Sequence, residues 1–270
     1  MPKLPKLPAP PLPGPLRSPP PRPGEDSGKG GPAEDAKAAG INVVGWVDER
    51  TSLSGAARWM MFRKVPKGTN WFYTLGSATM FAFLSQAVTG VFLAMYYRPD
   101  PAGGAYESIR YVTNDVFLGQ FVRGMHKWGS SVMVILVFLH MGRTFFFGAY
   151  KYPRELNWVI GVVLLILTMV MSFTGYLLPF DQRAYWATIV GVNINGTGPL
   201  IGPYLSDFLR AGPEFGATTL SRFYAIHMLL LPGALMALIS AHLYLVAKLG
   251  TTAPPWIKAE QSSELRKAEA

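Results

Sequence analysis

Residues 123–143 read RGMHKWGSSVMVILVFLHMGR, with two histidines 14 residues apart around an uncharged apolar centre. A second stretch at 223–247, FYAIHMLLLPGALMALISAHLYLVA, repeats the pattern with a spacing of 15. At 1.5 Å of rise per helical residue, the spacings correspond to about 21 and 22.5 Å along a helix axis. Two facing helices would therefore hold two histidine pairs at two depths, and these pairs account for all the histidines of the chain: His126, His140, His227 and His242.

Two imidazoles that face each other across a helical bundle are the axial ligands of a bis-histidine haem. Because both axial positions are filled, such a haem transfers electrons and offers no site to oxygen or substrate. The competing interpretation is that each histidine is a hydrogen-bonded polar residue of the core. Ionisable groups inside membrane segments are functional by default, so four at matched depths favour two haems.

The two histidine spacings place the side chains at different angles around a helix. A step of 14 residues at about 100° leaves two side chains some 40° apart, roughly on one face. A step of 15 leaves them about 60° apart in the other direction. Pro232 lies between His227 and His242. We therefore predict that a kink or local bulge in this helix absorbs the extra residue.

Long apolar segments explain the composition. Of the 270 residues, 50% are apolar and 15% are charged, whereas average soluble domains carry about 25% charged residues. About 20 apolar residues span a bilayer as a helix. We predict an all-α membrane protein, a four-transmembrane-helix di-haem bundle at 70–250, with helices over about 71–97, 121–147, 156–180 and 221–249.

The remaining segments flank this bundle. Residues 1–40 hold 12 of the 23 prolines and are predicted to be a disordered Pro-rich extension, a solvated spacer in preference to a docking motif. They lack the apolar core of a signal peptide. Residues 41–69 mix aromatic and basic side chains, which is typical of an amphipathic segment on the inner membrane surface. Residues 251–270 would form an inner-side tail, and the long loop 181–222 is expected to contain short helices on the outer surface.

The basic residues orient the predicted bundle. Four spans place both termini on one side, and that side carries 18 of the 25 Lys and Arg. Cytoplasmic flanks carry the excess of these residues, so we expect both termini in the cytoplasm. The Pro-rich start and the missing Cys favour a bacterial cytoplasmic membrane. Topology then explains the net charge of +9, and no nucleic-acid partner is expected. On this orientation His126 and His227 lie near the outer surface, and His140 and His242 lie toward the inner one.

Glycines repeat the 14-residue spacing on the two other apolar segments: Gly76 and Gly90 on one, Gly161 and Gly175 on the other. A flat macrocycle at each depth needs a place without a side chain on each flanking helix, and glycine provides that close approach. Packing of helices through small residues is the alternative. Equal spacing on both segments favours haem contact.

Haem propionates need cations near each macrocycle edge. Arg143 follows His140 by three residues and shares its helix face, and the outer pair is surrounded by Arg123, Lys127 and Arg222. These side chains could equally be topology anchors that extend to the membrane surface.

Residues 65–250 resemble cytochrome b6, the four-helix, di-haem subunit of cytochrome b6f complexes and counterpart of the N-terminal half of cytochrome b in bc1 complexes. The resemblance covers about two-thirds of the chain, in the expected order. It is carried by MYYRP (95–99), RGMHKW (123–128), FLHMGR (138–143), YPRELNWVIGVVL (152–164), TGYLLPFDQ (174–182), AYWA (184–187) and LSRFYAIHMLLLP (220–232).

The resemblance implies a role for individual residues. His126 and His227 would hold the low-potential outer haem iron, and His140 and His242 the high-potential inner one. The four spaced glycines match the family's haem-adjacent glycines, and Arg123 and Arg143 match its propionate arginines. The outer quinol-oxidation pocket is implied, by position alone, at Tyr176, Asp181, Tyr185 and Trp186.

The sequence departs from the family pattern in three places. Members of the b6 branch usually tether an extra c-type haem through a Cys early in the first helix. Thr74 stands there, and the chain has no Cys, so no covalent haem is expected. The usual basic residue after the last His corresponds to Ala247 and Lys248, which leaves the inner quinone site open. The PEWY-type motif of the quinol site is missing, so another subunit must supply its proton-accepting carboxylate.

The function that the resemblance implies is the di-haem cytochrome b subunit of a quinol:cytochrome c (or similar acceptor) oxidoreductase, which is not active alone. Quinol would be oxidised near the outer face and quinone reduced near the inner face, with proton translocation. Implied partners are a Rieske-type iron–sulfur protein, a subunit IV-like chain and a c-type cytochrome or similar acceptor, in a homodimer of complexes. The alternatives are a di-haem membrane anchor of another quinone-linked oxidoreductase, and a haem-free tethering protein.

Overall fold

The computed structural model describes residues 43, 45–52, 54–55 and 68–257, which belong to two units, 1–63 and 64–270. In the described part of the first unit, residues 45–51 are helical. The Arg50 guanidinium lies 4.1 Å over the Trp46 ring, and its Nη1 donates to the Trp46 carbonyl at 2.9 Å. The predicted extension 1–40 and most of the predicted surface segment and tail lie outside the described residues.

Four long helices form the second unit, and their hydropathy and length suit a membrane span. They confirm the four predicted helices to within a few residues, and the described residues contain no strand. Two spans have a second helical type within them. The spans are Trp71–Ala94, comprising η1 (Trp71–Thr74) and α3 (Leu75–Ala94); α5 (Gly119–Phe146); α6 (Glu155–Leu177); and Ala217–Leu249, comprising α9 (Ala217–Ala225), the π-helical η2 (Ile226–Leu230) and α10 (Leu231–Leu249).

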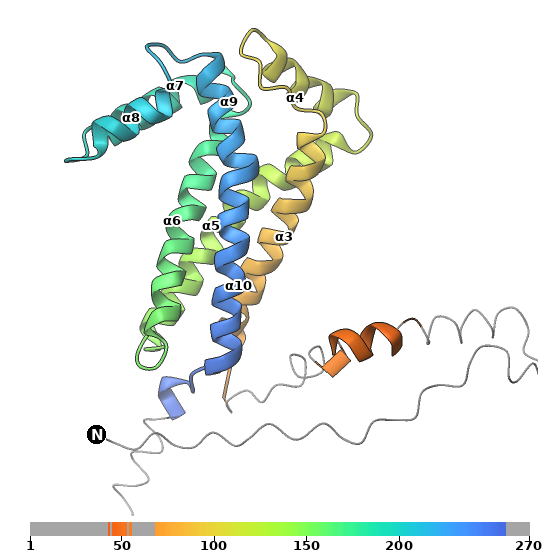
Figure 1. Ribbon diagram of the computed structural model, residues 1–270, viewed down its shortest axis with the longest axis vertical. Coiled ribbons are helices and arrows are strands. Elements are labelled where there is room, and N and C mark those ends of the chain that lie inside the picture. Colours follow the sequence, from red (N-terminus) through yellow and green to blue (C-terminus); the bar gives the residue numbers. More distant parts are fainter. Residues whose placement is uncertain (1–42, 44, 53, 56–67, 258–270) are drawn as a thin grey trace, which may run out of the picture. The chain divides into compact units, whose positions relative to one another are not determined.

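The spans pack as two pairs, α3 against α5 and α6 against α10. Three shorter helices lie at one end of the bundle (Figure 1): α4 (Gly104–Asn114), α7 (Gln182–Gly196) and α8 (Gly202–Arg210). We call this the α4/α7 end and the opposite one the α5–α6 loop end. Helices α7 and α8 confirm the prediction of short helices within 181–222, whereas α4 was not predicted.

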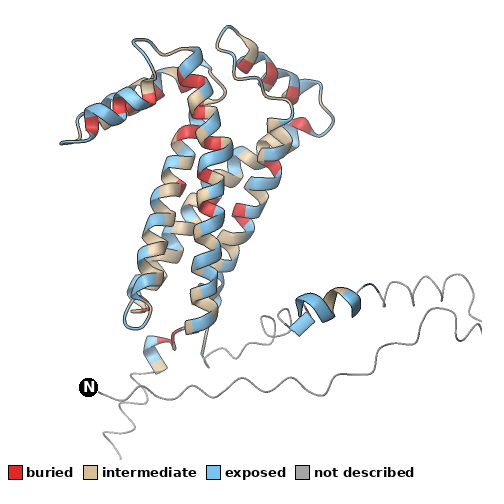
Figure 2. Ribbon diagram, in the orientation of Figure 1, coloured by how far each residue is buried: buried red, intermediate tan, exposed pale blue. Residues whose placement is uncertain are grey.

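Buried apolar side chains form two clusters. One lies at the α4/α7 end, where Leu177, Leu220 and Phe223 are almost fully buried. The other lies halfway along the bundle and contains Met133 and Leu235. Met133 is seven residues from both histidines of α5, so this second cluster separates the two histidine levels. Elsewhere the spans are largely exposed or half-buried (Figure 2).

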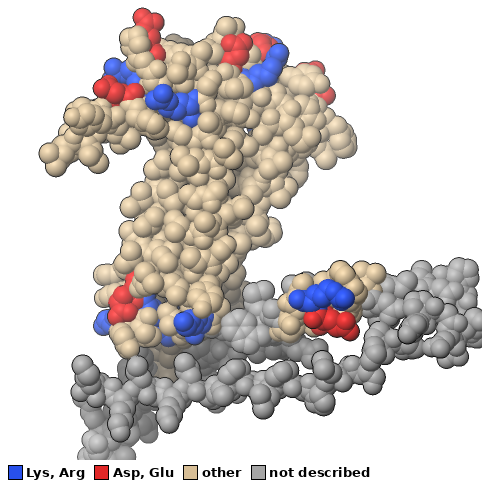
Figure 3. Space-filling view, viewed as in Figure 1, with Lys and Arg blue, Asp and Glu red and all other residues tan. Residues whose placement is uncertain are grey.

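Charged side chains gather at the two ends of the second unit, and the belt between them is uncharged on the face shown in Figure 3. Large apolar side chains are exposed along this belt, among them Phe81, Val88 and Leu229. An exposed apolar belt of this length is what a bilayer covers. The second unit is therefore an integral membrane protein.

Candidate haem-binding sites

Each histidine contacts a predicted glycine on the neighbouring helix of its own pair. An added Cβ at Gly76 would lie 3.1 Å from His140 Cε1, and one at Gly90 would lie 3.2 Å from His126 Cε1. In the other pair the corresponding contacts are Gly175 with His227 at 2.5 Å and Gly161 with His242 at 3.6 Å. The missing side chains thus let the imidazoles approach the neighbouring backbone. The spacing in the sequence had not indicated that the glycines contact the histidines themselves.

At each level, an imidazole of one helix pair lies near an imidazole of the other. At the α5–α6 loop end, the ring centres of His140 and His242 are 6.5 Å apart. Two metal–nitrogen bonds of about 2 Å each would place two ring centres roughly 6 Å apart, so this pair fits a shared iron. At the α4/α7 end, His227 is close enough to His126 to interact electrostatically. The structure therefore brings the four predicted ligands together as two pairs.

Helix geometry explains how a 15-residue step keeps both histidines of the last span on one face. His227 lies within η2, where the Leu231 amide donates to the Ile226 carbonyl five residues earlier, one residue more than in an α-helix. Pro232 follows directly and has no amide hydrogen to continue the α pattern. The π-helical turn absorbs the extra residue, as predicted.

The predicted propionate partners differ in their surroundings. Arg143 lies 3.7 Å over the Tyr73 ring, and its Nε and Nη2 are buried without a hydrogen-bond partner among the described residues. A guanidinium with two buried, unpaired nitrogens suits an anionic group such as a propionate. In contrast, Arg222 donates from Nη1 to the Phe208 carbonyl and lies over the Phe208 ring. Its guanidinium already has a partner in α8.

The predicted quinol-pocket residues fall in different places. Tyr176 lines a cavity of about 450 Å³ between α6 and α7. Asp181 caps α7, since its Oδ1 accepts from the Ala184 amide at 2.8 Å. Tyr185 packs edge-on against Trp186 and lines a second, smaller cavity. Of the four, Tyr176 alone borders the larger cavity.

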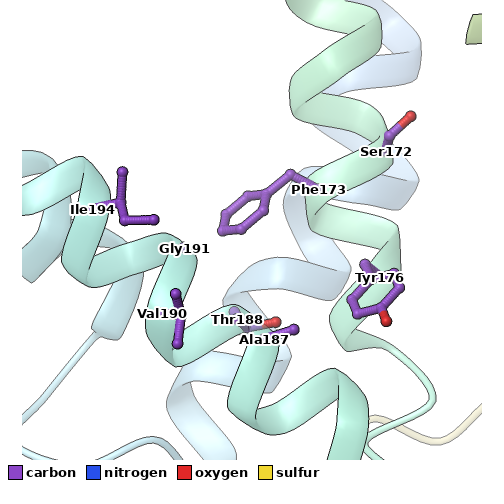
Figure 4. Close-up of a pocket in the computed structure, with 8 residues that line it drawn as sticks. All are labelled: Ser172, Phe173, Tyr176, Ala187, Thr188, Val190, Gly191 and Ile194. Carbon is purple, nitrogen blue, oxygen red and sulfur yellow. The ribbon is translucent and has the colours of Figure 1, made fainter.

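The larger cavity is mainly apolar, and the sequence pointed to few of its residues. Phe173 projects from α6 toward α7 (Figure 4), where an added Cβ at Gly191 would meet its ring at 2.6 Å. An apolar residue on a membrane helix and a lone glycine give no specific signal in a sequence. The remaining lining residues are Ser172, Ala187, Thr188, Val190 and Ile194.

The residues where the sequence departs from the family pattern lie at the α5–α6 loop end. Thr74 ends η1, and its hydroxyl donates to the Trp71 carbonyl at 2.7 Å. The Lys248 ammonium lies 5.8 Å from the centre of the Tyr244 ring. Among the described residues, neither side chain is hydrogen-bonded to a histidine.

Fold and site together define a class: a four-helix membrane protein with two histidine pairs stacked along its bundle. The family model described as Cytochrome b/b6/petB matches residues 60–250. The chain therefore belongs to the cytochrome b/b6 family.

Individual relatives agree with the family assignment. The menaquinol:cytochrome c reductase cytochrome b subunit of Geobacillus thermodenitrificans is 44% identical over 217 residues, which cover 77% of this chain and 96% of the relative. Cytochrome b6 of Heliobacterium modesticaldum is 42% identical over 213 residues, covering 78% of this chain and 100% of the relative. A solved chain of a hyperthermophilic respiratory Complex III superposes with a TM-score of 0.70 at 27% identity. That match covers 83% of this chain and 64% of the solved chain.

Proposed function

We propose that this chain is the di-haem cytochrome b subunit of a quinol:cytochrome c, or similar acceptor, oxidoreductase. The observation that carries the proposal is the pairing of four glycine-backed histidines at two levels of one membrane bundle. The names of the relatives, menaquinol:cytochrome c reductase cytochrome b subunit and cytochrome b6, support it. The family assignment favours this function over an anchor for an unrelated oxidoreductase.

His126 and His227 would hold one b-type haem, and His140 and His242 the other. Each haem, when bound, would supply reversible one-electron transfer, with imidazoles as its protein ligands. The glycines set the depth at which each imidazole lies against the neighbouring helix. Arg143 would pair with a propionate at the α5–α6 loop end, where its Nε and Nη2 have no hydrogen-bond partner among the described residues.

The cavity between α6 and α7 is our candidate for the quinol site. Its volume of about 450 Å³ lies within the range of small-molecule pockets. One turn of α6 serves both sites: Phe173 and Tyr176 line the cavity, whereas Thr174 and Gly175 contact His227. A ligand in the cavity would thus be separated from the His126–His227 pair by about one helix diameter, roughly 10 Å.

The α4/α7 end would face the outside, with both termini in the cytoplasm of a bacterial cell, in agreement with the distribution of Lys and Arg. Arg222 and the half-buried Arg123 lie at that outer end. The chain lacks a PEWY-type carboxylate motif. A subunit IV-like chain would supply it, and a Rieske-type protein and a c-type cytochrome would accept electrons in a dimeric complex.

The test is a haem count on the purified protein. A pyridine haemochrome assay with reduced-minus-oxidised spectra should give two b-type haems per chain and no c-type signal, since the sequence has no Cys. His140→Leu should remove one haem and retain the other. A preparation that binds no haem, or a His140→Leu variant that still binds two, would overturn the proposed ligands.

A further inference from the structure

Two threonines contact the histidines at the α4/α7 end. Thr89 Oγ1 lies 2.9 Å from His126 Nδ1, and Thr174 Oγ1 lies 3.1 Å from His227 Nδ1. Each threonine directly precedes the glycine against which that histidine packs. Both threonines are almost fully buried, so water does not compete for these contacts.

The direction of these hydrogen bonds follows from the other partners. Thr89 Oγ1 lies 2.6 Å from the Ser85 carbonyl, which can only accept, so the threonine hydroxyl donates there and accepts from the imidazole. His227 Nδ1 also lies 3.1 Å from the Met171 carbonyl. This nitrogen must therefore carry the proton. Both imidazoles then have an unprotonated Nε2, the atom that binds a metal.

At the α5–α6 loop end, no threonine hydroxyl among the described residues is hydrogen-bonded to His140 or His242 through the imidazole. Leu75 and Ile160 precede the glycines there, and neither has a polar side chain. His242 Nδ1 is buried without a hydrogen bond of normal geometry to the described residues, although the backbone of Asn157 lies near it. A backbone carbonyl thus faces an imidazole at both levels, whereas a threonine hydroxyl is added at one level only.

A hydrogen bond accepted from the outer nitrogen of a metal-bound imidazole raises the basicity of the nitrogen that binds the metal. A more basic ligand stabilises ferric over ferrous iron and lowers the reduction potential. We infer that Thr89 and Thr174 are positioning residues that lower the reduction potential of the haem at the α4/α7 end through these hydrogen bonds. This inference rests on the proposed haem ligands.

The experiment replaces each threonine by valine, which keeps its shape and removes the oxygen. Thr89→Val, Thr174→Val and the double variant are titrated potentiometrically, in the full chain and in a His140→Leu background that isolates one haem. Loss of such a partner changes metal affinity by about 10- to 100-fold. A tenfold change in affinity that affects only the ferric state corresponds to a shift of about 59 mV in the reduction potential of a one-electron couple. We expect an upward shift of this order at the α4/α7-end haem and none at the other.

Two threonines on the same helices provide matched controls. The hydroxyls of Thr79 and Thr168 lie 2.8 Å from the carbonyls of Leu75 and Leu164, and neither is hydrogen-bonded to a described histidine. Thr79→Val and Thr168→Val should leave both potentials unchanged, and Thr89→Ser and Thr174→Ser should retain most of the native value. If the valine variants bind two haems with native potentials, or shift both equally, the inference is wrong while the ligand assignment stands. A His126→Leu variant that keeps both haems would contradict the ligand assignment itself.

Discussion

Of the four glycines that pack against histidines, Gly175 lies closest to its imidazole. A methyl group there would lie 2.5 Å from His227 Cε1 and 3.1 Å from two further ring atoms. Because these atoms belong to a ring held by Thr174 and Met171, the imidazole cannot move without losing hydrogen bonds. Gly175→Ala should displace His227, lower the free energy of unfolding by about 1–3 kcal/mol, and remove the haem at the α4/α7 end in a pyridine haemochrome assay.

Gly161 provides the matched control for this substitution. A methyl group there would lie 3.6 Å from His242 Cε1, an ordinary van der Waals distance. Gly161→Ala should therefore retain two haems. Equal haem loss in the two variants would contradict the argument from ring contact, because it would mean that the glycines matter for helix packing alone.

The sequence predicted the positions of these glycines but not their contacts with the histidines. Equal spacing identified all four glycines, since spacing depends only on helical rise and phase. Their unequal contacts, from 2.5 to 3.6 Å, depend on how each helix is rotated against its neighbour. The partnership of Thr89 and Thr174 with the histidines depends on that same rotation. A single sequence contains no direct measure of it.

Among the helices, the last span has an irregularity that can be tested by deletion. Leu229 lies in the π-helical η2 with its side chain 77% exposed. Deleting it should restore regular α-helix and leave His227 and His242 14 residues apart, the step that α5 already uses. Two haems should be retained. Deleting the exposed Ile135 in α5 should remove at least one, because a 13-residue step leaves the histidines about 140° apart. Retention of both haems in both deletions would mean that helical phase is not limiting.

Tyr97 joins the end of the first span to the end of α6. Its hydroxyl donates to the Leu178 carbonyl at 2.6 Å, and burial, with a smaller effect of Tyr224, raises its pKa above the ordinary value of 10.0. Above about pH 10 the unfolded chain loses this proton and the folded chain keeps it, so the free energy of unfolding should fall as pH rises.

Thermal unfolding between pH 8 and 11 checks this. Tyr97→Phe removes the titrating group, so the free energy of unfolding of this variant should fall less steeply above pH 10. At pH 8 it should be about 1 kcal/mol lower than that of the wild type, because a hydrogen bond is lost. Tyr106→Phe, at an exposed tyrosine of α4, is the control. A Tyr97→Phe variant with the same alkaline slope as the wild type would show that another group controls this range.

The helices differ in how well the sequence predicted them. The four spans were predicted because each has about 20 apolar residues with few charges. Helix α4 was missed because its buried face consists of Ala105, Ser108 and Val112, which is too short and too polar to read as an apolar run. The length of the loop predicted that it contains short helices, which are α7 and α8. Their bounds were not predicted, because they depend on contacts such as the Asp181 cap.

At the scale of the whole molecule, every residue assigned to a haem or quinol site lies between positions 74 and 250, and the family match spans 60–250. The described residues 68–257 contain all four spans and both histidine levels. We therefore expect that deleting residues 1–42 leaves two b-type haems per chain, with wild-type spectra and midpoint potentials, in protein purified from membranes. The loss of 6 of the 25 Lys and Arg should also leave the orientation unchanged, because short flanks determine it. Loss of a haem in this variant would show that the N-terminal segment contributes to a haem site, and would extend the functional unit beyond the cytochrome b domain.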